Sequence, residues 1–321
     1  MSRVVVTGRI PDAAIEKLRA AHEVEMWPDP EPIGREELLR RVAGADAVVS
    51  LLTERIDAEL LDAAGRQLKV VANVAVGYDN IDVPACSERD VVATNTPGVL
   101  TDATADIAFG LILMATRRLG EGERLIRSGR EWKWGMFFLL GSGLQGKTLG
   151  VVGMGGIGQA TARRARARAF GMEIVYQSRS EIDAGIAAEL GARRVELDEL
   201  LSVSDVVSLH CPYGPATHHL IGAEQLAAMQ DSAYLVNTAR GPIVDEAALA
   251  SALREGRIAG AGLDVYEHEP RVHPELRELD NVVLLPHLGS ATVETRTAMA
   301  VLAAENVLAV LGGQRPPTPI G

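Results

Sequence analysis

The fold of this chain is decided by the stretch Leu149-Gly-Val-Val-Gly153-Met-Gly155-Gly-Ile-Gly158, where an apolar run leads directly into closely spaced glycines. The apolar run predicts a buried strand, and the residues after the last glycine predict a helix. In such a turn the first glycine permits the bend, the second lets the backbone approach a pyrophosphate, and the third lets the helix pack on the sheet. We therefore predict a dinucleotide site lined by Gly153, Gly155, Gly156, Ile157 and Gly158.

The next expected strand, 173–177, ends in Ser178-Arg179-Ser180. A site for NAD normally has Asp or Glu there, which accepts hydrogen bonds from the ribose 2′-hydroxyl. Ser178, Arg179 and Ser180 instead suit a 2′-phosphate, because guanidinium and small hydroxyl groups bind phosphate well. We predict a preference for NADPH/NADP+. The alternative is NADH/NAD+ as the cofactor, with Arg179 as a solvated loop residue.

Composition excludes several classes of protein. The chain has 321 residues, of which 47% are hydrophobic, so it can form two domains of ordinary size. Its net charge of −11 argues against a nucleic-acid surface. Cys86 and Cys211 lack metal or redox spacing and are expected to be free thiols in a reducing compartment. Without a signal-like or membrane-spanning apolar run, we expect a cytoplasmic protein with no membrane partner.

Short β-branched runs alternate with helical patterns along the chain, which is typical of α/β proteins with parallel sheets. Strands are expected at Val4–Val6, Val24–Trp27, Ala47–Ser50, Val70–Val74, Leu149–Val152, Glu173–Gln177, Val206–His210, Ala233–Asn237, Gly260–Val265 and Val282–Leu285. The longest helices are expected at 101–118, 156–170 and 292–311. We predict two Rossmann-like, doubly wound parallel-sheet domains separated by a cleft. Residues 1–98 and 289–321 would form a discontinuous substrate-binding (catalytic) domain, and residues 99–288 the dinucleotide-binding domain.

Three candidate catalytic residues, Arg240, Glu269 and His287, each come just after an expected strand, where open α/β sheets place their ligands. The guanidinium fork of Arg240 suits a carboxylate next to a carbonyl. A glutamate bonded to one imidazole nitrogen of His287 would fix the tautomer and leave the other nitrogen to exchange a proton. These groups together suit the reduction of a ketone by hydride.

A zinc site is not expected. His268, Glu269 and His273 resemble a zinc-binding helix at first sight, but the two histidines are five apart around Pro270. The H-E-x-x-H pattern needs them four apart on one helical face. We predict no metal.

Several further stretches carry a family resemblance: Val76–Asp82, Asn95–Gly98, His210–Pro212, Asn237–Gly241, Gly262–Pro270 and Pro286–His287. Together with the glycine turn they occur in the order found in D-isomer-specific 2-hydroxyacid dehydrogenases. The chain resembles this family over nearly its whole length, and within it glyoxylate and hydroxypyruvate reductases.

The resemblance implies roles for individual residues. Arg240 would bind substrate, Glu269 would partner His287, and His287 would be the acid/base. Leu52 and the backbone of Val76 and Gly77 would contact the small 2-oxo acid. The residues implied at the cofactor are Thr104, Cys211, Pro212, Thr217, Thr238, Ala239, Asp264 and Gly289. The resemblance also implies a homodimer that forms through the cofactor domain and the Thr101–Gly143 region.

The sequence departs from the family pattern in one place. The expected helix after the glycines is about two residues longer than usual, which would shift the register of Ser178 and Arg179. The predicted reactions are reduction of glyoxylate to glycolate and of hydroxypyruvate to D-glycerate. The alternatives are an enzyme of this family for phosphoglycerate, phenylpyruvate, formate or phosphite, a broad-specificity reductase, or a non-catalytic dinucleotide sensor.

Overall fold

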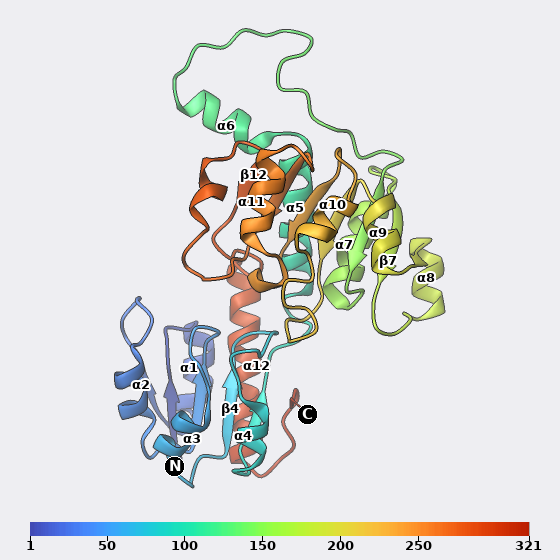
Figure 1. Cartoon of the computed structure of the whole chain (residues 1–321). Helices are drawn as coiled ribbons and strands as arrows, with labels where there is room; N and C mark the ends of the chain where they lie inside the picture. Colours follow the sequence, from blue (N-terminus) through green and yellow to red (C-terminus); the bar gives the residue numbers. More distant parts are fainter. Residues whose placement is uncertain (321) are drawn as a thin grey trace. The chain divides into compact units, whose positions relative to one another are not determined.

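The computed structural model describes residues 1–320, which divide into two compact units (Figure 1). The first unit contains Met1–Leu100 and the chain from Ser290 onward. The second unit is the continuous segment Thr101–Gly289. The first unit is therefore built from the two ends of the chain. No helix among the described residues is long and apolar enough to cross a membrane.

The first unit has a sheet of five parallel strands in the order β2-β1-β3-β4-β5. The strands are β1 (Arg3–Val6), β2 (Glu23–Met26), β3 (Ala47–Ser50), β4 (Val70–Asn73) and β5 (Val92–Thr94). The helices are α1 (Asp12–Arg19), α2 (Arg35–Val42), α3 (Ala58–Ala64), α4 (Val83–Ser87) and α12 (Val293–Leu311). The edge strand β5 was not expected from the sequence, since its three residues are too few to show a pattern.

Both faces of this sheet are covered. Val5 belongs to one apolar cluster with side chains of α2 and α3, whereas Val4 and Val6 belong to another with α1 and α12. Successive strand residues point to opposite faces, so an unbroken run of valines fits a sheet buried on both sides. Helix α12 contributes a row of small buried residues to the second cluster: Ala300, Ala303, Ala304 and Val307.

The second unit has seven parallel strands in the order β12-β11-β10-β9-β6-β7-β8. They are β6 (Thr148–Val152), β7 (Glu173–Gln177), β8 (Arg193–Arg194), β9 (Val206–Leu209), β10 (Tyr234–Asn237), β11 (Gly260–Leu263) and β12 (Val282–Leu284). The helices are α5 (Thr101–Thr116), α6 (Leu119–Arg127), α7 (Gly156–Arg166), α8 (Ala184–Leu190), α9 (Leu197–Val203), α10 (Ala223–Ala228) and α11 (Glu246–Arg254). Short 3₁₀ helices cover Gly241–Ile243 and Pro274–Glu278.

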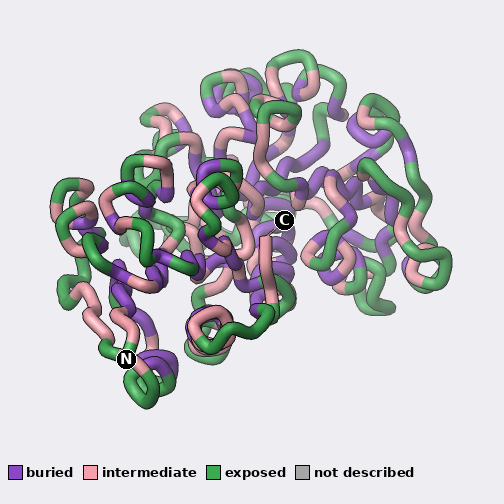
Figure 2. The backbone as a smooth tube through the Cα atoms, turned by 90° about the horizontal axis from the view of Figure 1, so that it is seen from below, coloured by how far each residue is buried: buried purple, intermediate pink, exposed green. Residues whose placement is uncertain are grey.

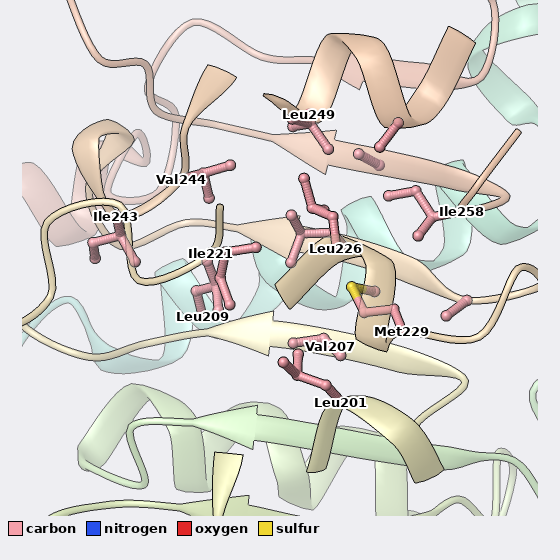
Figure 3. Close-up of a cluster of buried hydrophobic side chains, with 14 of the residues drawn as sticks. Leu201, Val207, Leu209, Ile221, Leu226, Met229, Ile243, Val244, Leu249 and Ile258 are labelled. Carbon is pink, nitrogen blue, oxygen red and sulfur yellow. The ribbon is translucent and has the colours of Figure 1, made fainter. Parts of the chain in front are cut away.

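The strand order reverses at β6, because β7 and β8 lie on one side of it and β9 to β12 on the other. Open α/β sheets bind ligands beyond the carboxyl ends of the strands at such a switch point. Figure 3 shows part of the core that covers this sheet, an apolar cluster that includes Val207 and Leu209 of β9, Leu226 of α10 and Leu249 of α11. Most strand residues are buried, and Figure 2 shows the buried stretches of the backbone in purple. The predicted fold class, two parallel-sheet α/β domains, is confirmed.

Two helices end earlier in the structure than the sequence predicts. The helix expected over 156–170 stops at Arg166, where Ala167 leaves the helical conformation with ψ 142°. The following residues form a turn in which Phe170 packs edge-on against Phe109, with ring centroids 4.6 Å apart. The long helix expected over 101–118 ends at Thr116, and α6 follows it.

The residues between α7 and β7, 167–172, form a turn and not a continuation of the helix. Strand β7 begins in register with β6, since Thr148 pairs with Glu173 and Val152 with Gln177. Ser178 therefore follows the strand directly.

Candidate active site

The three candidate catalytic residues follow three neighbouring strands. Arg240 comes after β10, Glu269 lies in the loop after β11, and His287 comes after β12. These strands are hydrogen-bonded neighbours and parallel, so their carboxyl ends meet at one edge of the sheet. The order of the strands thus brings the three loops together.

His287 and Glu269 form a direct pair. Nδ1 of His287 lies 2.7 Å from Oε2 of Glu269. The other carboxylate oxygen of Glu269 accepts the backbone N–H of Tyr266 at 3.1 Å. Because a carboxylate only accepts hydrogen bonds, Nδ1 carries the proton in this arrangement and Nε2 is the nitrogen that can act on a ligand.

Two opposing effects act on the pKa of Glu269. Burial raises it, but the hydrogen bond and charge of His287, the Tyr266 N–H and the charge of Arg240 lower it more, so the net pKa lies below its ordinary value. Glu269 is therefore ionised at neutral pH. Its negative charge faces the imidazole of His287.

The backbone at His287 is held in an unusual conformation. Its φ is +55°, a left-handed value that residues other than glycine rarely adopt. Asp264 fixes this turn: its carbonyl accepts the N–H of His287 at 2.9 Å, and its carboxylate accepts those of Leu288 at 2.6 Å and Gly289 at 2.8 Å. Burial raises the pKa of Asp264 despite these two donors. Strained residues of this kind persist when surrounding contacts over-determine them, and they occur often at functional sites.

The loop of Arg240 is fixed by Asn237, the last residue of β10. The side-chain amide of Asn237 donates to the carbonyl of Arg240 at 2.8 Å and accepts the N–H of Ala239 at 3.0 Å. Gly241 packs so closely that a Cβ there would lie 1.8 Å from the carbonyl carbon of Tyr266. Only glycine allows the Arg240 loop to lie this near the Glu269 loop.

A second pair of carboxylates supports the Glu269 loop, and no sequence pattern predicts it. Glu246 accepts the N–H groups of Glu267 at 2.8 Å and His273 at 3.3 Å, while Glu267 accepts the N–H of Glu246 at 2.8 Å. Burial raises the pKa of Glu246. Its position in the first turn of α11 looks like an ordinary helix start, so the sequence carries no signal of this contact.

The glycine turn has the geometry needed for a dinucleotide. Gly153 has φ +95°, and a Cβ there would lie 2.4 Å from the backbone nitrogen of Cys211. A Cβ on Gly158 would lie 2.3 Å from the carbonyl oxygen of Gly153, so α7 packs directly on the turn. Gly155 caps α7 without a side-chain bond, and the space around a Cβ placed there is open. The N-terminus of α7 can therefore receive a phosphate.

A buried hydroxyl also points to a ligand at this edge. Thr238, directly after β10, is 8% exposed, and its hydroxyl has no hydrogen-bond partner among the described residues. Buried polar atoms are normally bonded. Together with the open glycine turn, this unsatisfied hydroxyl fits a bound nicotinamide dinucleotide.

Two other residues expected at the cofactor, Thr104 and Thr217, form hydrogen bonds with nearby loops. Thr104 donates to the carbonyl of Gly289 at 3.1 Å, which joins it to the Asp264 turn. Thr217 donates to the carbonyl of Pro212 at 2.9 Å, and it shapes the loop that follows β9. Cys211, the second residue of this loop, is buried, and burial raises the pKa of its thiol to about 11. The two threonines thus fix loops around the glycine turn.

The loop after β7 carries Ser178, Arg179 and Ser180. Ser178 donates to the carbonyl of Ser180 at 2.5 Å, and the side chain of Arg179 is exposed. Arg194, on β8, donates to the carbonyls of Ser178 at 2.8 Å and Arg179 at 3.2 Å. No pattern in the sequence marks Arg194, because its strand has only two residues.

In the first unit, the expected substrate residues lie in two loops after β3 and β4. Leu52 is 41% exposed, and Val76 and Gly77 are half-buried. Asn73 donates to the carbonyl of Gly77 at 3.0 Å, and Asn80 donates to the carbonyl of Leu51 at 3.2 Å. Asn73 and Asn80 also bond to each other, so they link the two loops.

Among residues 1–320, no group of three or more His, Cys, Asp or Glu side chains could hold a metal ion. The candidate site consists of the His287–Glu269 pair, Arg240 and the glycine turn.

Comparison with known proteins agrees with this geometry. Residues 109–289 match the family described as "D-isomer specific 2-hydroxyacid dehydrogenase, NAD binding domain". The chain belongs to the D-isomer specific 2-hydroxyacid dehydrogenase family. It is 52% identical to the glyoxylate reductase of Thermococcus onnurineus over 321 residues, which cover 98% of this chain and 95% of that relative.

Solved structures of this dehydrogenase family show the same fold. A glyoxylate reductase from Paecilomyes thermophila superposes with a TM-score of 0.90 at 37% identity and covers 99% of this chain and 98% of its own. An NADPH-dependent glyoxylate/hydroxypyruvate reductase from Sinorhizobium meliloti, in complex with NADP and malonate, gives 0.87 at 36% identity and covers 100% and 97%. The predicted family and enzyme class are therefore confirmed, and the chain is an oxidoreductase with a nicotinamide dinucleotide cofactor.

Proposed function

We propose that this D-2-hydroxyacid dehydrogenase is an NADP(H)-preferring reductase of small 2-oxo acids, with glyoxylate and hydroxypyruvate as substrates. The observation that carries the proposal is the His287–Glu269 pair, which leaves Nε2 of His287 available beside the Arg240 loop. The names of the T. onnurineus and S. meliloti relatives support the choice of substrates.

The proposed chemistry divides between cofactor and protein. The nicotinamide ring supplies a hydride to the carbonyl carbon when the cofactor is bound. Nε2 of protonated His287 gives a proton to the developing alkoxide, and the carboxylate of Glu269 stabilises the imidazolium before transfer. Arg240 binds the substrate carboxylate and polarises the carbonyl. Proton transfer by a positioned side chain typically contributes ~10²–10⁴ in rate.

The proposed cofactor preference rests on the loop after β7. Ser178 follows β7 where an NAD site has a carboxylate, and Arg179 is exposed. A guanidinium and hydroxyl groups stabilise a 2′-phosphate but gain little from a ribose hydroxyl. Arg179→Asp should therefore reverse the preference toward NADH.

The first unit is proposed to bind substrate, through the backbone of Val76 and Gly77 with Leu52 beside them. The exposed fractions of these residues leave them accessible to a small molecule. The second unit is proposed to bind the cofactor.

We also propose a homodimer through the Thr101–Gly143 region. Helix α6 has no buried residue, and Figure 1 shows the long segment after it running clear of the other elements of the unit. Large hydrophobic side chains are exposed along this stretch: Leu119, Ile126, Trp132, Trp134, Met136, Phe137, Phe138 and Leu140. Exposed apolar patches of this kind mark protein–protein contacts, and sedimentation of the purified protein would test the dimer.

The test of function is oxidation of NADPH and NADH by the purified protein with glyoxylate, hydroxypyruvate, pyruvate, phenylpyruvate and no substrate. The proposal expects the fastest turnover with NADPH and one of the two small oxo acids. Turnover with NADH alone would retain the reductase and remove the cofactor preference. Tight cofactor binding with no turnover on any 2-oxo acid would replace the reductase by a dinucleotide sensor.

A further inference from the structure

Two adjacent arginines on the edge strand β8 have different surroundings. Arg193 pairs with Val175 of β7 and Arg194 with Tyr176, one residue closer to the carboxyl end of β7. Successive strand residues point to opposite faces of a sheet. Arg193 forms an ion pair with Glu199 of α9 at 2.6 Å, whereas Arg194 reaches the loop after β7.

Arg194 fixes the backbone of that loop. A single terminal nitrogen of its guanidinium, Nη2, donates to the carbonyls of both Ser178 and Arg179, at 2.8 Å and 3.2 Å. Pinning two successive carbonyls sets the direction of the side chains between them. The other terminal nitrogen, Nη1, lies 3.8 Å from Oε1 of Glu181.

The loop after β7 carries groups that can bind an anion. Arg194 and Arg179 bring two cations to a segment whose Ser178 and Ser180 supply hydroxyl groups. The side chain of Arg179 has no partner among the described residues, so its position depends on the backbone that Arg194 holds. The ion pair of Arg194 with Glu181 is weak, because the Glu181 side chain is 80% exposed.

We propose that Arg194 is a further specificity-determining residue for the 2′-phosphate of the cofactor. It acts by holding Ser178 and Arg179 in place and by adding a second positive charge. This inference rests on the proposed preference for NADP(H). Nothing in it alters the chemistry at His287.

The test measures binding of two cofactor fragments to the whole protein by calorimetry: adenosine 2′,5′-bisphosphate, which carries the 2′-phosphate, and 5′-AMP, which lacks it. Arg194→Ala should weaken the bisphosphate roughly three- to tenfold, as expected for one partly exposed charge, and leave 5′-AMP within about twofold. Arg194→Lys, which keeps the charge and loses the fork, should fall between the two. The ratio of KM values for NADPH and NADH should move in the same direction.

Arg193→Ala is the matched control, since it removes the same charge from the neighbouring position and should leave the fragment ratio unchanged. A purely structural role for Arg194 would weaken both fragments equally and would overturn the proposal. The proposal would also be overturned if Arg194→Ala left the ratio of the two fragment affinities unchanged while Arg179→Asp abolished the preference for the bisphosphate. That result would leave the NADP(H) preference standing. Equal binding of the two fragments by the unmodified protein would instead remove that preference, and the role of Arg194 with it.

Discussion

Replacement of Glu269 by glutamine tests the central pair of the site most directly. The carboxamide of Glu269→Gln has the shape of the carboxylate and can still accept the proton on Nδ1 of His287, 2.7 Å away. It carries no charge, so the protonated imidazole loses its stabilising partner while the geometry is retained. The variant therefore tests the charge of the Glu269 side chain without changing its position.

The size of the effect follows from the geometry. A hydrogen bond to a charged group contributes about 1.5–3 kcal/mol. The side chains of His287 and Glu269 are 28% and 31% exposed, so solvent screens the pair in part and the lower half of that range applies. At about 1.4 kcal/mol for each tenfold change, kcat should fall roughly 10- to 40-fold.

Steady-state kinetics with glyoxylate would measure the fall in kcat, and the fluorescence of NADPH would give its Kd. The Kd should stay within about twofold of the unmodified protein. The pKa of Glu269 lies below its ordinary value of 4.5, so the contribution of the pair is present above that pH and is lost as the pH falls through the lowered pKa. The glutamine variant should lack this acid limb.

Glu275→Gln is the matched control, because it makes the same chemical change at an exposed ion pair with Arg254. Its kcat should stay within about twofold of the unmodified value. A kcat for Glu269→Gln that equals that of this control would refute the role of the carboxylate charge.

Three further predictions concern the proton donor, the loops of the first unit and the thiols. His287→Ala should lower kcat by ~10²–10⁴ with little change in the Kd for NADPH; a variant with normal turnover would exclude His287 as the acid. Asn80→Ala removes the donor to the carbonyl of Leu51 and should raise KM for glyoxylate several-fold with a smaller change in kcat, and an unchanged KM would contradict the link between the loops. Cys86 and Cys211 are buried, and burial raises the pKa of each thiol to about 11, so a thiol reagent at pH 8 should label neither in the native protein and both after denaturation; rapid native labelling would be inconsistent with this burial.

Much of the fold could be predicted from the sequence because its signals are local. The bounds of β3 and β7, at Ala47–Ser50 and Glu173–Gln177, are those expected from their apolar runs. The strands β5 and β8 could not be found this way, since they have only three and two residues and are defined by their neighbours in the sheet. The end of α7 at Arg166 was also missed, because Arg and Ala favour a helix and the turn depends on the distant contact between Phe170 and Phe109.

The site divides in the same way. Strand ends and residue chemistry are enough to select Arg240, Glu269 and His287 as candidates. The sequence does not show what fixes their loops, since the bonds from Glu246 to the Glu267 loop join residues 21 apart and depend on tertiary structure. Arg194 was missed for a similar reason, because an arginine in an unrecognised two-residue strand looks like a solvated charge.

The two-part composition of the first unit affects how the protein is made. The face of its sheet formed by Val4 and Val6 is covered in part by α12, which is synthesised only after the whole of the second unit. During translation the second unit can complete its own core, while the first keeps an apolar sheet face without its final cover. Nascent chains halted before Val293 should therefore be the ones that chaperones retain and that aggregate when released.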